Sequence, residues 1–257
     1  MYLRTKLHNM PLRTETFDNR HDEKEKLDGF IDGNQRDQSI LKSVDTKVRV
    51  FFQSWKQELL KLIEEHDHVY GCVAYLTDID ILKALSKKQS VQILIQHEDF
   101  LRPDGKLTKK HLQKAYDNLP RADWHAMEDR RTLTIADQIS TNGQPAGHDD
   151  PILQVKSKDA KQGGVLHHKF LVFWKDSGYT HDEEGMLQDL QYSGVWTGSV
   201  NITNTATDNL ENAVYMESHD IAEAYMTEWA QILLLAERLD WNVEYNFERG
   251  RNFRLGT

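Results

Sequence analysis

The sequence predicts an α/β fold in which a mixed β-sheet is flanked by helices. Three features of the chain predict it. Short apolar segments alternate with helical patterns between residues 47 and 119, strand-like segments return after residue 151, and a long amphipathic stripe follows them. Strands that alternate with helices build a largely parallel sheet that helices cover. We therefore expect an α/β/α sandwich.

In the first half of the chain, apolar spacing separates strands from helices. Residues 48–52 alternate as in a strand, and Ser54 with Gln57 has the spacing of a capping box ahead of a helix. The expected elements are a strand at 48–52, a helix with Trp55, Leu59, Leu62 and Ile63 on one stripe, a strand at 69–76, a helix at 78–87, a strand at 91–95 and a helix at 107–119 that Pro120 ends.

The second half begins after a surface loop, which the turn formers of residues 141–151 predict. Strands are expected at 152–155, 165–173, 193–200 and 212–216, and an amphipathic helix carries Ile221, Tyr225, Trp229, Ile232, Ala236 and Leu239 on one stripe. Strict alternation from Trp241 to Phe247 predicts one more strand. The parallel start and these later strands together indicate a mixed sheet.

Composition and charge indicate the domain organisation, the compartment and the partners that the chain fits. Residues 1–44 are polar and of mixed sign, which predicts a solvated extension that could bind a protein partner, followed by one domain at 45–257. The single cysteine, Cys72, fits a reducing compartment, and neither a targeting segment nor a membrane span is visible. We expect a cytoplasmic protein with no membrane association. The net charge of −9 means that local patches must hold any nucleic acid.

Two short segments carry residues suited to phosphodiester chemistry. His167 and Lys169 are two positions apart, as are Ser199 and Asn201, so each pair shares one face of a predicted strand. A neutral imidazole can attack phosphorus while an ammonium, a hydroxyl and a carboxamide stabilise the charge on its oxygens. Glu211 could hold the histidine ring in one tautomer. These five residues form the predicted catalytic site.

The same segments resemble the signature of the phospholipase D superfamily, which is H-x-K, an aspartate and then G-S-x-N. His167 to Lys169 matches the first part, residues 198–201 match the last, and Glu211-Asn212 is similar to an acidic pair in the small nucleases of that superfamily. The resemblance runs from about residue 48 to 239. It implies a phospholipase D-like sandwich and a phosphodiesterase that works through a covalent phosphohistidine without a metal or cofactor.

The chain departs from that signature in two places. The aspartate falls at position 174, which is Trp174, and Asp176 lies two residues later. The segment from Asp176 to Tyr192 is long and acidic, so it predicts an inserted loop beside the site.

The resemblance also implies an assembly. The family's mechanism uses two histidines, and this chain has one H-x-K/G-S-x-N set. We therefore expect a homodimer in which a two-fold axis brings two copies of His167 into one shared active site.

Nuclease activity on DNA or RNA is the leading hypothesis, and two alternatives stay open. One is a lipid phosphodiesterase or phosphatidyl transferase. The other, which Trp174 keeps open, is a weakened nucleic-acid-binding or assembly module. Aromatic and basic residues at the C-terminus could also bind nucleic acid. They are Phe247, Arg249, Arg251, Phe253 and Arg254.

Zinc is the competing use of histidine, but the other candidate histidines lack the spacing of a metal site. They are His66, His68, His97, His111, His125, His148, His181 and His219. His66 and His68 read as a polar turn after a helix, and His168 as a structural residue. No metal is expected.

Overall fold

The computed structural model describes residues 46–52, 54–97, 108–123, 149–155, 166–175, 192–233 and 235–242. All of them belong to one compact unit that spans residues 42–257. The predicted extension at 1–44, the greater part of the loop at 141–151, Asp176 and the aromatic and basic C-terminus lie outside the described residues. So does the predicted last strand beyond residue 242.

One mixed sheet contains the eight strands of the described residues. They are β1 (Lys47–Phe51), β2 (His68–Val73), β3 (Ser90–Gln96), β4 (Ile152–Val155), β5 (Lys169–Trp174), β6 (Tyr192–Gly198), β7 (Ala213–Glu217) and β8 (Ala236–Arg238). Their order across the sheet is β1-β7-β6-β5-β2-β3-β4-β8. β2, β3 and β4 run parallel to one another, and every other neighbouring pair is antiparallel.

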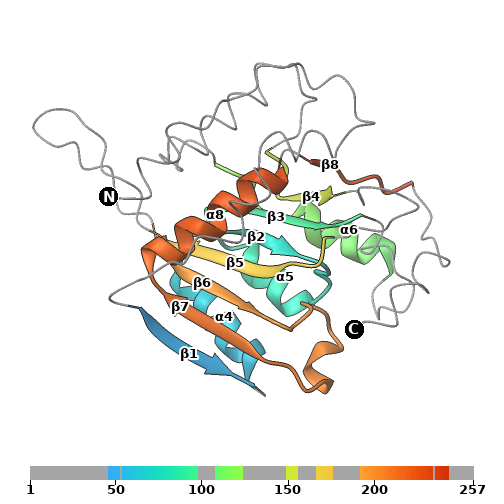
Figure 1. Ribbon diagram of the computed structural model, residues 1–257. Helices are drawn as coiled ribbons and strands as arrows, with labels where there is room; N and C mark the ends of the chain where they lie inside the picture. Colours follow the sequence, from blue (N-terminus) through green and yellow to red (C-terminus); the bar gives the residue numbers. More distant parts are fainter. Residues whose placement is uncertain are drawn as a thin grey trace, which may run out of the picture. The chain divides into compact units, whose positions relative to one another are not determined.

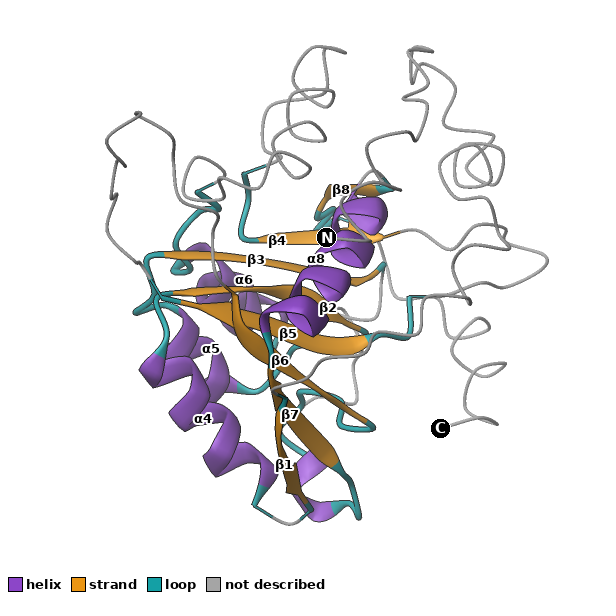
Figure 2. Cartoon of the chain, turned by 60° about the vertical axis from the view of Figure 1, so that its left-hand side comes forward, coloured by secondary structure: helices purple, strands orange, loops and turns teal. Residues whose placement is uncertain are grey.

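Helices cover both faces of this sheet, as Figure 1 and Figure 2 show. The described helices are α4 (Trp55–Glu65), α5 (Ile79–Leu85), α6 (Lys109–Asp117), α8 (His219–Leu233) and the short 3-10 helix η2 (Ala206–Asp208). The first three share one apolar core with one face of the sheet, and α8 shares a second core with the opposite face. The predicted α/β/α sandwich with a mixed sheet is confirmed.

The central strands are apolar because helices bury both of their faces. Every residue of β2, β3 and β5 is buried. The amphipathic stripe of α4 faces this core, and its four predicted residues Trp55, Leu59, Leu62 and Ile63 are all buried. Short apolar runs were therefore a reliable signal for the strands that carry the site.

Three local predictions are wrong. The Ser54 side chain makes no capping hydrogen bond, so the capping box does not form. β1 does not join the parallel strands but pairs with β7, at the end of the described sheet. The last helix ends at Leu233, and Ala236 lies in β8, where it pairs with Val155 of β4. Pairing along the open edge of β4 outweighs the continued helical spacing.

The apolar alternation of β1 faces solvent. Val48, Val50 and Phe52 are 56%, 54% and 64% exposed, whereas Phe51, between two of them, is buried against the core of α4. α8 packs over β6, β5, β2 and β3. The apolar side chains of β1 therefore belong to a face of the sheet that α8 leaves open.

Strand direction brings the predicted catalytic segments to one edge of the sheet. β5 begins at Lys169 beside the end of β2, and Val73 pairs with Lys169. β6 ends at Gly198 beside the start of β7, where Gly198 pairs with Ala213. We call this the site edge: the ends of β2, β3 and β6 and the starts of β5 and β7.

In the part of the chain that the structure describes, no helix has the length and apolar character needed to cross a membrane.

Candidate active site

The predicted site residues flank the strands rather than lie within them. β5 begins at Lys169, so His167 stands two residues ahead of the strand, and Ser199 and Asn201 follow β6. The prediction that each pair shares one face of a strand is therefore wrong. Strand pairing stops at this edge because the chain leaves the sheet there. The segment ahead of β5 bonds to the end of β2 through the His168 carbonyl oxygen, which accepts from the Ala74 amide at 2.9 Å.

His167 and Lys169 touch through the atoms that matter for nucleophilic chemistry. The ammonium Nζ of Lys169 lies 3.1 Å from Nε2 of His167, and it also donates to the His167 carbonyl oxygen at 3.1 Å. An ammonium can only donate, so Nε2 is the acceptor and the ring proton sits on Nδ1. The imidazole is thus held as a neutral ring with its lone pair on Nε2.

The surroundings of the pair favour that neutral state. Partial burial and then the charge of Lys169 lower the pKa of His167 below its ordinary value of 6.5. Burial also lowers the pKa of Lys169, while the charge of Glu211 acts in the opposite direction. His167 is exposed at the surface and Lys169 is buried, so the imidazole is accessible to a substrate while its partner is fixed.

Ser199 and Glu211 meet across the ends of β6 and β7. The Ser199 hydroxyl donates a short hydrogen bond to Oε2 of Glu211 and accepts one from the Asn212 amide at 3.1 Å. Within the described residues no hydrogen bond joins Glu211 to His167, so the predicted tautomer-holding role of Glu211 is not seen in this chain. Glu211 instead orients Ser199 and contributes negative charge near Lys169.

Gly198 permits this meeting because it has no side chain. A Cβ atom at position 198 would lie 2.7 Å from Cα of Ala213 and still closer to the carbonyl oxygen of Asn212. Both atoms belong to the backbone of the neighbouring segment and cannot move aside without shifting it. The glycine of the G-S-x-N motif is therefore required by the close approach of two chain segments.

Asn201 lies in the segment that joins β6 to η2. Its Oδ1 atom is buried and has no hydrogen-bond partner among the described residues. Buried polar atoms are nearly always paired in a folded protein. A phosphoryl oxygen is an acceptor like Oδ1, so the group of this carboxamide that could serve a phosphate is the Nδ2 donor.

Backbone contacts place Asn201 on the same edge as His167. The amide of Ala74 donates to the carbonyl oxygen of His168. Tyr75 follows Ala74 in the chain, and its carbonyl oxygen accepts from the amide of Ile202 at 3.2 Å. The segment that follows β2 therefore bonds to a neighbour of His167 on one side and to a neighbour of Asn201 on the other. His167, Lys169, Ser199, Asn201 and Glu211 all gather at the site edge.

Two supporting residues escaped the sequence analysis. Gln96, buried at the end of β3, accepts through Oε1 from the amide of Leu166 at 2.6 Å and so fixes the chain just ahead of His167. Thr197 donates its hydroxyl to the carbonyl oxygen of Lys169 at 3.0 Å. The signal available for Gln96 was a buried polar residue that ends an otherwise apolar strand.

His168 points away from the site. Its Nε2 lies 3.3 Å from the carboxylate of Glu228 on α8, and its ring meets Phe170 edge-on. Both partners belong to the α8 side of the sheet. The predicted structural role of His168 fits these contacts.

Other histidines are used by the fold. His66, which follows α4, and His68, which opens β2, are both buried. His66 donates from Nδ1 to the Leu62 carbonyl at 2.7 Å, and Nδ1 of His68 lies 2.7 Å from the Ser90 hydroxyl. Across the described ranges, no three His, Cys, Asp or Glu side chains are placed to hold a metal ion. His125, His148 and His181 lie outside those ranges.

Trp174 occupies the opposite end of β5 from Lys169. Its ring is fully buried, stacks on His68 at 5.2 Å between centroids and meets Tyr192 edge-on. Trp174 also pairs with Tyr192 at the start of β6. The predicted inserted loop at 176–192 lies outside the described residues except for Tyr192, so its place beside the site stays a prediction.

Comparisons with other proteins find distant likenesses. No protein-family model matches the chain. An uncharacterized protein of Acanthamoeba polyphaga mimivirus is 26% identical over 212 residues, which cover 77% of this chain and 69% of the viral protein.

Two solved structures also resemble the chain at low identity. NucT from Helicobacter pylori has a TM-score of 0.48 at 16% identity and covers 76% of this chain and 100% of its own. Nuc from Salmonella typhimurium, a phospholipase D family member, has a TM-score of 0.42 at 18% identity and covers 75% and 97%. Likenesses at this level assign no function, so the proposal for this chain rests on the contacts of its own residues.

Proposed function

We propose that this chain is a metal-independent phosphodiesterase that cleaves nucleic acid through a covalent phosphohistidine on His167. The observation that carries the proposal is the hydrogen bond from Lys169 Nζ to His167 Nε2. It holds an accessible, neutral imidazole beside a buried cation. That is the arrangement needed to attack phosphorus and to stabilise the charge on its oxygens.

The reaction has two displacement steps at one phosphorus. In the first, Nε2 of His167 forms a bond to phosphorus and the P–O bond to the leaving group breaks, while a protonated imidazole gives its proton to the leaving oxygen. In the second, water attacks phosphorus and gives a proton to the imidazole that acted as the acid, the N–P bond breaks and His167 returns as a neutral ring. Lys169 and Asn201 donate hydrogen bonds to the phosphoryl oxygens throughout, while the Ser199 hydroxyl stays bonded between Glu211 and the Asn212 amide.

The second imidazole comes from His167 of another copy of the chain. One H-x-K/G-S-x-N set is present in the sequence. A homodimer with its two-fold axis at the site edge provides the missing acid, because an isologous contact places identical residues opposite each other. Its two rings hold opposite protonation states, which predicts a bell-shaped dependence of kcat on pH.

The placement of Trp174 supports an active enzyme rather than a weakened binding module. Position 174 lies at the far end of β5, in the core, where Trp174 packs on His68 and Tyr192. The change from the signature's aspartate to tryptophan therefore alters packing at the opposite edge. It removes no group from the site edge.

The test compares the parent chain with His167→Ala and with the matched control His168→Ala. Each is incubated with plasmid, single-stranded DNA, RNA, a chromogenic phosphodiester and phosphatidylcholine vesicles, with and without EDTA. We expect parent and control to cleave nucleic acid equally well with EDTA, and His167→Ala to lose on the order of 10³-fold or more in kcat. The control is suitable because the His168 side chain faces α8.

Several outcomes would contradict the proposal. Activity of His167→Ala within a few-fold of the parent would remove the nucleophile. Cleavage that EDTA abolishes and Mg²⁺ or Zn²⁺ restores would contradict metal independence. Hydrolysis of the vesicles alone would indicate the lipid phosphodiesterase, and binding without cleavage would indicate the assembly module.

A further inference from the structure

The side chain of Asn204 ties the segment that carries Asn201 to the start of α5. Its Nδ2 donates to the carbonyl oxygen of Thr77 at 3.0 Å, and its Oδ1 accepts from the amide of Ile79 at 3.4 Å. Ile79 opens α5, where backbone amides have no partner inside the helix. One carboxamide thus satisfies an acceptor and a donor of the same turn.

Backbone bonds reinforce this contact immediately after Asn201. The carbonyl oxygen of Ile202 accepts from the amides of Thr77 at 2.8 Å and Asp78 at 3.2 Å, and the Ile202 amide donates to Tyr75 at 3.2 Å. Ile202 and Leu76 also form a parallel β-bridge. Residues 202–204 are therefore held to the turn between β2 and α5 by backbone and side chain together.

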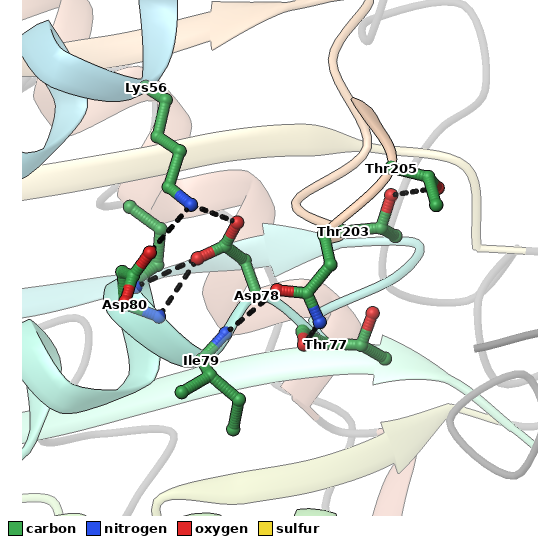
Figure 3. Close-up of polar contacts among 9 residues, drawn as sticks. Lys56, Thr77, Asp78, Ile79, Asp80, Thr203 and Thr205 are labelled. Carbon is green, nitrogen blue, oxygen red and sulfur yellow. Dashed lines mark hydrogen bonds and ion pairs between the residues drawn. The ribbon is translucent and has the colours of Figure 1, made fainter. Parts of the chain in front are cut away.

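The turn that receives these bonds is itself held in place. Asp78 is fully buried and caps α5, accepting through Oδ1 from the amides of Asp80 at 3.0 Å and Ile81 at 3.1 Å (Figure 3). Its Oδ2 pairs with Lys56 of α4 at 2.8 Å, and Lys56 also pairs with Asp80 at 2.9 Å. A capping carboxylate at a helix N-terminus is stabilising, and the lysine supplies its counter-charge.

We propose that Asn204 is a positioning residue that fixes the carboxamide of Asn201 for binding the phosphoryl group. This inference rests on the proposed function of the site edge. Asn201 is the last residue before the bonded segment 202–204, and its own Oδ1 has no partner among the described residues. Its orientation is therefore set by its neighbours, and Asn204 is the side chain that bonds those neighbours to the fixed turn.

The chemistry of the contact requires asparagine. The side chain must donate to Thr77 and accept from Ile79 at once, and a carboxamide of this length does both. An aspartate keeps the acceptor but loses the donor and sets a carboxylate against the Thr77 carbonyl oxygen. An alanine loses both bonds and leaves the backbone bonds of Ile202 in place.

The first experiment measures steady-state kinetics of Asn204→Ala and Asn204→Asp in the full chain on a chromogenic phosphodiester. A shift of about 1 Å in a catalytic group can reduce the rate by about 10²-fold. We expect kcat to fall about 10- to 100-fold with little change in KM, because an oriented donor acts mainly in the transition state. Thr207→Ala is the control, since Thr207 lies exposed in the adjoining η2.

A double-mutant cycle separates positioning from general destabilisation. If Asn204 acts through Asn201, the variant with both residues replaced by alanine loses no more activity than Asn201→Ala alone. If the double variant loses activity by the product of the two single-variant losses, the proposal is overturned. A parental kcat in Asn204→Ala would also overturn it.

Hydrogen exchange tests the contact without relying on activity. In Asn204→Ala we expect faster exchange of the amides of Thr77, Ile79 and Ile202, while Thr207→Ala retains parental protection. If the parent cleaves no substrate, the proposed function fails, and the positioning contact is then judged by exchange alone. Unchanged protection in Asn204→Ala would overturn it.

Discussion

The Nζ atom of Lys169 lies 3.1 Å from Nε2 of His167 and 3.1 Å from the carbonyl oxygen of the same residue. The Lys169 ammonium therefore fixes both the orientation of the His167 ring and the ring nitrogen that carries the proton. Because a lysine ammonium has three donors, it can keep the carbonyl bond and turn another donor toward a phosphoryl oxygen when a substrate arrives. Under the proposed function, the imidazole is thus held ready to attack phosphorus without being protonated.

The first prediction concerns the pKa of His167. Burial of the ring and the charge of Lys169 both lower that pKa. Lys169→Met removes the charge and keeps much of the burial, so the pKa of His167 should rise toward 6.5. Nuclear magnetic resonance titration of the His167 ring signals in the full chain measures it. Lys61→Met on the exposed face of α4 is the control, and an unchanged pKa in Lys169→Met would show that the two side chains are not coupled in solution.

A second prediction concerns Gly198. Gly198→Ala forces a Cβ atom against the backbone of Asn212 and Ala213, so β6 and β7 must separate at the site edge. The expected loss is about 1–3 kcal/mol of unfolding free energy, as for other overpacked sites. Activity should fall further than stability alone explains, because Ser199 and Glu211 move apart.

Urea unfolding and turnover measured on the same preparation check the Gly198 prediction. Ser193→Ala, at the other end of β6, is the control and should change both quantities little. Parental stability of Gly198→Ala would mean that the segments have room to adjust.

The third prediction is a dependence of stability on pH that originates at His66. Burial lowers the pKa of His66 below 6.5, against the Leu62 hydrogen bond, which acts to raise it. As the pH falls below that value, the unfolded chain binds more protons than the folded one, so stability is lost on acidification. Melting temperatures between about pH 7.5 and pH 5.5 should therefore fall in the parent and fall less in His66→Gln. Identical slopes would exclude His66 as the source.

The fourth prediction tests the shared site. Parent and His167→Ala chains are unfolded together at equal concentration and refolded so that dimers form at random. If each reaction needs both copies of His167, about a quarter of the dimers are competent. Independent sites would retain about half of the activity. Light scattering gives the mass in parallel, and a fully active monomer would contradict the homodimer.

The sequence predicted the central strands and their helices because these elements bury apolar residues at a regular spacing. Residues 69–76 and 91–95 read as buried strands, and β2 and β3 are buried throughout. Pairing between distant segments leaves no such trace. Nothing in the spacing of β1 indicated β7 as its partner, and nothing near Ala236 indicated pairing with β4.

At the site, residue types were predictable but contacts were not. The motifs brought His167, Lys169, Ser199, Asn201 and Glu211 to attention, and the structure gathers them at one edge. Partner choice depends on tertiary geometry, so Glu211 was expected to hold His167 and instead bonds to Ser199. Gln96 and Asn204 were missed because a single glutamine or asparagine has no recognisable spacing.

The pairing of β1 with β7 has a consequence for how the chain is made. Lys47 and Glu217, which face each other across these strands, are 170 positions apart. A ribosome adding about 5–20 residues per second needs roughly ten to thirty seconds to cover that distance. Throughout that time β1 has been synthesised, but its partner β7 has not. The nascent chain therefore keeps the backbone groups of β1 without their β7 partner until β7 emerges, and an unpaired strand of this kind can pair with another chain.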